Sequence, residues 1–340
     1  MTARPASVAA LLVAAAWARA SAAGGPRAVP VLVNAEPKAS FVLIYFAHQR
    51  GYFRDEGVDV RFAPIPSGRA EDKLNALANG SMDVAVTAYN TAMNKALPAA
   101  GFKIVADGSR RSAGKPALNY FLVRADLAGT VRGFADLRGR TVALLAPGSF
   151  PHFDLLRGLE RAGLRAEDAT ITFAPETALS ARFAGGAFDV ASVREPAAGA
   201  LAARGVGRVF AGSDAAPSSG HVTLLAYSRR FMADKPRAER FMLAYVRAAR
   251  DLQSARPEEL AEVMEKSLGV RVDSALLSRF QVDRDAGVDV PSLMADQAFA
   301  KERGLVAKEL ARDELVDLSF LEKALRTLAS RRKAAGSASE

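Results

Sequence analysis

The chain has 340 residues, half of them apolar, and its 46 Lys and Arg residues outnumber its 37 Asp and Glu residues, giving a formal net charge of +9. This length and composition exclude a fibrous or disordered chain and predict a substantial core divided between two domains. The basic residues are spread along the chain, which argues against a nucleic-acid partner. The absence of cysteine excludes disulfides, thiolate nucleophiles, cysteine metal sites and a lipidated cysteine anchor.

The N-terminal residues have the pattern of a secretory signal. Arg4 supplies a positive charge, residues 8–17 are apolar, and small residues follow through Ala22. The apolar run is shorter than the roughly 20 residues that a membrane span needs, which favours export with cleavage over an N-terminal anchor. We therefore expect residues 1–22 to be a signal peptide and the mature protein to be periplasmic.

Strands alternate with helices in two successive series. In the first series, apolar runs predict strands and helical spacing predicts helices at residues 29–33, 41–51, 58–64, 74–78, 83–87 and from 89 onward. About a hundred residues later the same order returns at residues 141–145, 152–163, 170–174, 179–184 and 189–193. Because each strand is followed by a helix, mostly parallel sheets are expected, with ligands at the carboxyl ends of the strands.

Short sequences repeat between the two series. Gly80-x-x-Asp83-Val84-Ala85 returns as Gly186-x-x-Asp189-Val190-Ala191, and Phe-Ala-Pro at 62–64 returns at 173–175. Coincidence in an alanine-rich chain is the alternative explanation. The agreement in order favours a structural duplication. From residue 231 onward the apolar spacing is helical, including Leu277 with Phe280, and after residue 330 no packing pattern remains.

Five stretches in this order resemble a known family. They read YFAHQRGYFRDEGVDVRFAPIPSG, NGSMDVAVTAYNTAMNKA, DLRGRTVALLAPGS, GAFDVASVREPAAGALAARGVGRVF and YSRRFMADKPRAERFMLAYVRA, and they cover nearly all of residues 29–327. With them the chain resembles the solute-binding proteins of ABC importers in the nitrate, sulfonate, taurine and thiamine-precursor group, the SsuA/THI5-like (NMT1) family.

The resemblance implies an α/β protein with the type II periplasmic-binding-protein fold. In that fold two lobes, each with a mostly parallel sheet flanked by helices, are joined by two crossing strands, here expected near 119–124 and 221–228. The implied function is capture of a small polar organic molecule by hinge closure and delivery to an inner-membrane permease, by a monomer without cofactors. The expected divisions are a signal at 1–22, lobe 1 at 23–118 and 225–329, lobe 2 at 119–224, and a disordered tail at 330–340.

The break at Pro147-Gly148-Ser149 is the first candidate for a ligand-binding loop. A strand-to-helix junction points free N–H groups at a ligand, but Pro151 has none, which weakens an oxyanion site and leaves Phe150 to stack on or shield an organic ligand. We expect Ser149 to cap the helix by accepting from a first-turn N–H. A nucleophile role is disfavoured because the Gly-x-Ser-x-Gly pattern of esterases is absent.

Other strand ends add polar candidates whose roles stay open. The resemblance places Glu195 at the cleft, where it either accepts from an amine or amidine of the ligand or holds Arg194. His152 is expected beside the helix cap, and Arg110 and Arg111 on the surface. No catalytic or metal-binding residue is predicted. The predicted ligand-binding set is Asn34, Phe41, Ser67, Gly68, Tyr89, Asn90, Gly148, Ser149, Phe150, Glu195 and His221.

An enzyme is the main alternative, because the same fold serves thiamine-pyrimidine synthesis and a cysteine-dependent desulfinase. The missing cysteine removes the nucleophile and the cysteine-rich iron-site motif, and His48, His152 and His221 lack metal-site spacing. Binding without catalysis is therefore expected. A sensory receptor domain is a further alternative, and the sequence does not name the ligand.

Overall fold

The computed structural model describes residues 29–36, 38–65, 69–112, 114–213, 220–269 and 272–337. From Val31 onward the chain forms one compact unit. The predicted signal at 1–22 and the candidates Ser67 and Gly68 lie outside the described residues. In the ranges that are described, no helix combines the length and the apolar character needed to cross a membrane.

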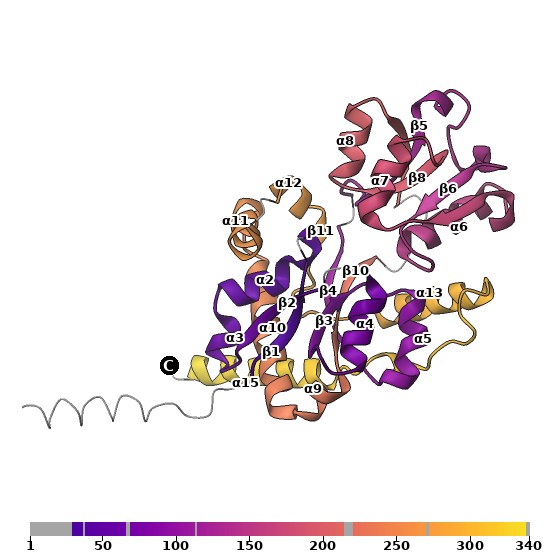
Figure 1. Ribbon diagram of the computed structural model, residues 1–340. Coiled ribbons are helices and arrows are strands. Elements are labelled where there is room, and N and C mark those ends of the chain that lie inside the picture. The colour runs from indigo at the N-terminus through magenta and orange to yellow at the C-terminus, as the bar shows by residue number, and fades with distance from the viewer. Residues whose placement is uncertain are drawn as a thin grey trace, which may run out of the picture. The chain divides into compact units, whose positions relative to one another are not determined.

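The first of two sheets is built around a parallel triplet (Figure 1). Strand β1 pairs in parallel with β2 and β3, and β10 runs antiparallel between β3 and β4. The order across the sheet is β11-β4-β10-β3-β1-β2. Its strands are β1 (Val31–Ala35), β2 (Val60–Pro64), β3 (Val84–Thr87), β4 (Lys103–Arg111), β10 (His221–Tyr227) and β11 (Phe280–Gln281).

The second sheet repeats this plan with strands that are consecutive in the chain. Strand β6 pairs in parallel with β7 and β8, and β5 runs antiparallel between β8 and β9. The order is β7-β6-β8-β5-β9. Its strands are β5 (Asn119–Arg124), β6 (Thr141–Leu144), β7 (Thr170–Phe173), β8 (Val190–Arg194) and β9 (Gly207–Gly212).

Matching hydrogen bonds confirm the duplication that the repeated sequences predicted. In the first sheet the Leu32 N–H donates to Asp83 Oδ2 at 3.0 Å, and the Asp83 N–H donates to the Leu32 carbonyl at 3.0 Å. In the second, the Thr141 N–H donates to Asp189 Oδ2 at 2.9 Å, and the Asp189 N–H donates to the Thr141 carbonyl at 3.1 Å. The repeated Asp therefore anchors the start of the central strand in both halves.

Helices follow the strands, as the alternating pattern predicted. Those of the first half are α2 (Val42–Gln49), α3 (Tyr52–Asp55), α4 (Ala70–Ala78) and α5 (Thr91–Ala100). Those of the second half are α6 (Phe150–Arg161), α7 (Glu176–Ala184) and α8 (Ala197–Ala203). The C-terminal helices are α9 (Arg229–Ala233), α10 (Lys235–Leu252), α11 (Pro257–Leu268), α12 (Ser274–Leu277), α13 (Val290–Glu302), α14 (Arg312–Leu315) and α15 (Ser319–Ser337). Short 3₁₀ turns are η1 (Ala39–Phe41), η2 (Ala125–Leu127), η3 (Phe134–Leu137) and η4 (Ala166–Asp168).

Each sheet is covered on both faces, which explains its nearly continuous apolar strands. Alternate residues of β3 enter different cores: Val84 and Val86 pack with α2 and α10, whereas Ala85 packs with α4 and α5. In the second sheet Val142 and Ala143 divide in the same way, Val142 with α6 and Ala143 with α7 and α8.

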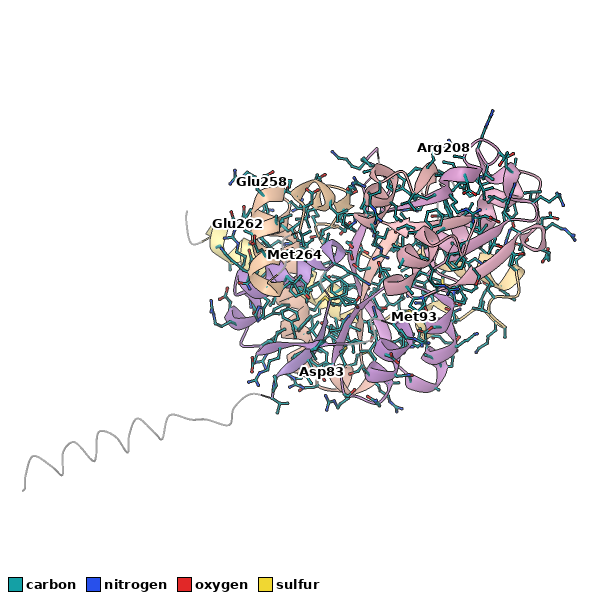
Figure 2. The ribbon with its side chains drawn as sticks, turned by 45° about the horizontal axis from the view of Figure 1, so that its top comes forward. Asp83, Met93, Arg208, Glu258, Glu262 and Met264 are labelled. Atoms are coloured by element: carbon teal, nitrogen blue, oxygen red, sulfur yellow. The ribbon has the colours of Figure 1, made fainter. Side chains whose placement is uncertain are left out.

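The C-terminal helices pack onto the first sheet and its helices. α10, α11 and α15 share a core with α2, β1 and β4. Figure 2 shows Glu258 and Glu262 on the outer side of α11, whereas Met264 is fully buried in that core. Apolar residues on one face of α11 therefore hold it on the domain, as the helical spacing indicated.

Three sequence predictions need correction. Strand β5 belongs wholly to the second sheet and β10 wholly to the first, so the chain passes between the sheets after β4 and after β9, and not within 119–124 and 221–228. Phe280 lies in β11 rather than on a helix with Leu277, because Phe280 pairs with Arg111 of β4. The tail predicted as disordered from 330 is helical to Ser337, and Arg331 within it donates to both carboxylate oxygens of Glu56.

Candidate functional site

A cavity of about 550 Å³ is lined by loops from both sheets and by the segment that contains α12. One part of its wall is apolar, and the rest carries charged side chains of both signs. The apolar lining residues are Ala39, Leu118, Phe150, Pro196, Val222, Val272, Leu276 and Phe280. The polar and charged ones are Lys38, Ser40, Glu176, Arg194, Glu195, Asp273 and Arg279.

The cavity lies at the carboxyl ends of parallel strands, where the alternating strand and helix order predicted a cleft. Lys38 follows β1, Phe150 begins the helix after β6, and Glu176 begins the helix after β7. Arg194 ends β8, and Glu195 comes next. Because parallel strands end at one edge of a sheet, residues far apart in sequence share this wall.

A row of alternating charges runs along one side of the cavity. Lys73 Nζ lies 2.6 Å from Glu36 Oε1, and both side chains are less than a tenth exposed. Lys38 Nζ lies 2.9 Å from Glu36 Oε2 and 3.3 Å from Glu176 Oε2. The row ends where Arg194 Nε lies 3.7 Å from Glu176 Oε1.

Both carboxyl groups in this row remain ionised. Burial by itself raises the pKa of Glu36, but Lys73 and Lys38 outweigh it and the pKa falls below its ordinary value. Burial likewise opposes ionisation of Glu176, and Arg194 and Lys38 lower its pKa. Burial also lowers the pKa of Lys73, although Glu36 acts in the opposite direction. We take Lys73 to be charged, because Glu36 is 2.6 Å away.

Glu195 lines the cavity with partners already in place. Its Oε2 accepts from the Gly199 N–H at 3.0 Å, and its Oε1 lies 3.5 Å from Arg279 Nη1. Arg279 also donates to the Ala117 carbonyl at 2.9 Å. Of the two roles left open for Glu195, holding neighbouring groups is therefore observed, although the cation is Arg279 and not Arg194.

The loop Pro147-Gly148-Ser149 between β6 and α6 is stabilised by a hydrogen bond to His152. The Gly148 N–H donates to His152 Nδ1 at 2.9 Å, and burial lowers the pKa of His152 to about 4. Gly148 has a φ of +63°, and a Cβ there would lie 2.1 Å from Thr91 Cγ2, so only glycine fits. This turn packs directly on the start of α5.

The expected cap by the Ser149 side chain is wrong. Ser149 occupies the N-cap position of α6, but its Oγ donates to the Ala146 carbonyl at 2.8 Å and accepts nothing from the first turn. Phe150, next in the chain, lines the cavity, with the Arg111 guanidinium 5.8 Å from its ring. Among the predicted ligand-binding residues that the structure describes, Phe150 and Glu195 are thus the two on the cavity wall.

The first-half candidates make contacts that hold the fold together. Asn34 Oδ1 accepts from the Val86 N–H at 2.7 Å, and its Nδ2 donates to the Val86 carbonyl at 3.0 Å, which joins β1 to β3. Asn90 caps α5, Tyr89 donates to Asn94, and Phe41 is buried beside Tyr45. None of these four candidates lines the cavity.

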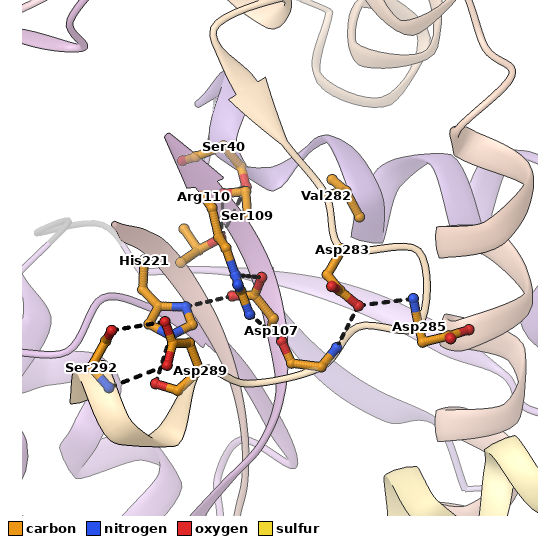
Figure 3. Close-up of polar contacts among 12 residues, drawn as sticks. Ser40, Asp107, Ser109, Arg110, His221, Val282, Asp283, Asp285, Asp289 and Ser292 are labelled. Atoms are coloured by element: carbon orange, nitrogen blue, oxygen red, sulfur yellow. Dashed lines mark hydrogen bonds and ion pairs between the residues drawn. The ribbon is translucent and has the colours of Figure 1, made fainter. Parts of the chain in front are cut away.

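His221 belongs to a buried polar group with Asp107 (Figure 3). Its Nδ1 lies 2.8 Å from Asp107 Oδ1, and its Nε2 lies 3.4 Å from the Asp289 carbonyl. Ser292 Oγ donates to the carboxylate of Asp289 and not to the imidazole, so this is no Ser-His-Asp triad. Within the described ranges, no three His, Asp or Glu side chains gather as metal ligands.

The two arginines expected on the surface are partly buried. Arg110 Nε donates to Asp107 Oδ2 at 2.8 Å, and Arg110 Nη2 also donates to the Gly287 carbonyl. Arg111 Nη1 donates to the Ser213 carbonyl at 2.5 Å. Both side chains therefore link β4 to segments distant in sequence, which a solvated surface role does not describe.

Sequence reasoning missed the residues that come from distant segments. The candidates did not include Lys38, Glu176 or the residues of the α12 segment, which are Asp273, Leu276 and Arg279. The position of Glu176 right after a predicted strand was a usable signal for that residue. Nothing local marks Arg279, because its partner Glu195 lies more than 80 residues earlier in the chain.

Comparison with known proteins gives a family and a fold. Residues 38–260 match the family described as NMT1/THI5 like. A protein of Brucella abortus strain 2308, named only as a binding protein, is 27% identical over 235 residues, which is 68% of each chain.

Solved structures share the fold at low sequence identity. The alkanesulfonate-binding protein SsuA from Xanthomonas axonopodis pv. citri, bound to MOPS, is 20% identical with a TM-score of 0.62, over 89% of this chain and 99% of that one. The desulfurization enzyme DszB, bound to biphenyl-2-sulfinic acid as a cysteine-to-serine variant, is 18% identical with a TM-score of 0.60, over 88% and 99%. The fold therefore hosts both binding proteins and an enzyme.

Proposed function

The chain belongs to the NMT1/THI5-like family, and on this premise we propose that it is a periplasmic solute-binding protein that delivers a small polar organic molecule to an ABC permease. The observation that carries the proposal is the cavity at the strand ends, whose wall is shared by both sheets. A ligand in this position touches both halves of the molecule at once. Binding can therefore be coupled to a change between the halves.

The size and lining of the cavity favour an organic ligand. About 550 Å³ lies within the usual range for small-molecule sites and exceeds what an inorganic ion such as nitrate would fill. Phe150, Leu276 and Phe280 supply apolar wall, and charged groups stand beside them. The ligand class best matched is a molecule with a charged or polar group on an apolar or heteroaromatic body.

The proposed motion separates two lobes. Lobe 2 begins at 119 and ends at 212 rather than 224, because β10 belongs to the first sheet and therefore to lobe 1. The chain passes between the sheets after Arg111 and after Gly212. The contacts to be broken on opening include the 3.3 Å hydrogen bond from Thr91 Oγ1 to the Pro147 carbonyl and the pair of Lys38 with Glu176. Closure around ligand restores the hydrogen bond from Thr91 to Pro147.

Binding without chemical change is favoured over catalysis. The related desulfurization enzyme was solved with a cysteine replaced by serine, and this chain has no cysteine at any position. His221 directs both ring nitrogens at fixed partners, so it offers no free base to the cavity. A bound organic molecule therefore meets no activated nucleophile among the described lining residues.

A ligand screen tests the proposal. Residues 23–340 are purified and melted with alkanesulfonates, taurine, nitrate, aromatic carboxylates and aminopyrimidines, and one organic class is expected to raise Tm in a saturable way. Mass spectrometry of the recovered compound is expected to show it unchanged. Phe150→Ala should weaken binding by about tenfold through lost apolar contact, whereas Glu262→Gln on the outer side of α11 should leave it unaltered. Chemical conversion of the compound would contradict the proposal. So would a ligand that binds Phe150→Ala as tightly as it binds the wild type.

A further inference from the structure

Resting on the proposed function, we propose that Glu176 occupies an anion-binding position between Lys38 and Arg194, and that the anionic group of an organic ligand replaces its carboxylate. Glu176 Oε2 lies 3.3 Å from Lys38 Nζ, and its Oε1 lies 3.7 Å from Arg194 Nε. Lys38 follows a strand of the first sheet, and Arg194 ends a strand of the second. One carboxylate thus joins cations from both halves of the cavity wall.

The charges of the row leave room for an exchange of anions. Glu36 already has two cations, Lys73 at 2.6 Å and Lys38 at 2.9 Å. Arg194, by contrast, has Glu176 as its one carboxylate partner within the described part of the chain. When Glu176 turns away, Arg194 loses its counter-charge and Lys38 keeps only the shared Glu36. An incoming monoanion would restore the balance.

Glu176 is the carboxylate that can leave. Its side chain is 42% exposed, whereas that of Glu36 is 5% exposed and also accepts from Asn34 Nδ2. Glu176 is the first residue of α7, and the N–H groups of Ala178 and Leu179 donate to the Pro175 carbonyl, not to its side chain. Rotation into water therefore breaks only two ion pairs, which partial exposure keeps weak.

The surroundings select the body of the ligand. Phe150 and Leu118 share the cavity with the two cations, and Leu276 and Phe280 stand on the wall formed by the α12 segment. A free inorganic anion would bind the two cations but would leave this apolar surface exposed to water. The exchange therefore favours an organic monoanion, with its carboxylate or sulfonate between Lys38 and Arg194 and its apolar part against the rings.

Calorimetry with a matched pair of probes tests the exchange. Benzenesulfonate is titrated at low ionic strength into the wild type, Glu176→Gln and the control Glu167→Gln, an exposed carboxylate on η4. Neutral benzenesulfonamide serves as the uncharged probe. Removing the competing charge is expected to tighten benzenesulfonate binding by about fivefold or more in Glu176→Gln, with no change for benzenesulfonamide or in the control. Lys38→Met is expected to weaken benzenesulfonate binding.

The outcomes separate this inference from the proposed function. Equal or weaker benzenesulfonate binding by Glu176→Gln, or no binding by either protein at millimolar concentration, overturns the exchange. An anionic ligand found in the wider screen that binds Glu176→Gln and wild type equally would do the same while leaving the solute-binding function intact. Glu176→Ala is measured in parallel, and melting curves verify that each variant folds.

Discussion

The two halves of the molecule share a backbone plan but use their strand-end loops differently. Asp83 and Asp189 make the same hydrogen bonds at the start of the two central strands. Two residues beyond the anchored Leu32 and Thr141, Asn34 corresponds to Ala143. In the first half the Asn34 side chain bonds the backbone of Val86, whereas in the second half Ala143 pairs directly with Ala191.

This difference shows where a duplicated fold keeps side chains available for a ligand. In the first half, Asn34 is hydrogen-bonded to β3 and Asn90 caps α5. In the second half, β6 and β8 pair through their own backbone groups without a side chain between them. Glu176, Arg194 and Glu195 then line the cavity. The second half therefore supplies three of the six charged lining residues, the first half supplies Lys38, and the α12 segment supplies Asp273 and Arg279.

The largest expected effect comes from Asn34→Ala. The substitution leaves the buried N–H and carbonyl of Val86 without partners, which should cost about 3–4 kcal/mol of unfolding free energy. Urea denaturation measures it, with the exposed helical Asn75→Ala as a control that should change little. A loss of unfolding free energy below about 1 kcal/mol would mean that β1 and β3 can form their backbone hydrogen bonds without Asn34, as β6 and β8 do.

Asp83→Ala and Asp189→Ala compare the equivalent anchors directly. Asp83 is 1% exposed and also accepts from Arg230 Nη2 at 2.8 Å, whereas Asp189 is half-buried. We expect a loss of about 2–3 kcal/mol for Asp83→Ala and about 1 kcal/mol for Asp189→Ala. The same denaturation measurement decides the ranking, and a larger loss at Asp189 would show that backbone register matters more than burial.

His152, at the start of α6 in the second half, makes the folding stability depend on pH. The start of α5 in the first half has no equivalent histidine. Burial holds the pKa of the folded His152 at about 4, below the ordinary 6.5, so the unfolded chain binds more protons between these values. This contribution to stability is complete above pH 6.5 and declines as the pH falls towards 4, by about 2 kcal/mol at pH 5.

The test compares the wild type with His152→Asn, whose amide oxygen can still accept from the Gly148 N–H. The wild type should lose about 2 kcal/mol more than the variant between pH 7 and pH 5. Denaturation curves at the two pH values give both numbers. If the wild type and the variant lose the same unfolding free energy between pH 7 and pH 5, a group other than His152 takes up the proton.

Most helices and strands could be predicted because local signals define them. The buried run at 83–87 became β3 (Val84–Thr87), and the helix expected over 41–51 is α2 (Val42–Gln49). Its end before Gly51, where φ is +80°, follows from the freedom of glycine in that region. Of the cavity residues, Phe150 and Glu195 could be foreseen because Phe150 begins the helix after β6 and Glu195 directly follows β8.

The remaining cavity residues could not be foreseen because their roles depend on partners distant in sequence. Asn34 and His221 looked available for a ligand until Val86 and Asp107 proved to be their partners. Arg279 reached the wall through pairing with Glu195.

The sequence by itself determined the alternation of strands and helices, the repeated Asp anchors and the absence of cysteine chemistry. Only the tertiary structure decided which polar groups were left for the cavity. The physical reason is that a buried polar side chain must find a hydrogen-bond partner, and that partner is fixed by which strands become neighbours. Lys38 and Arg194 both pair with Glu176 because the parallel strands of the two sheets end at the same cavity.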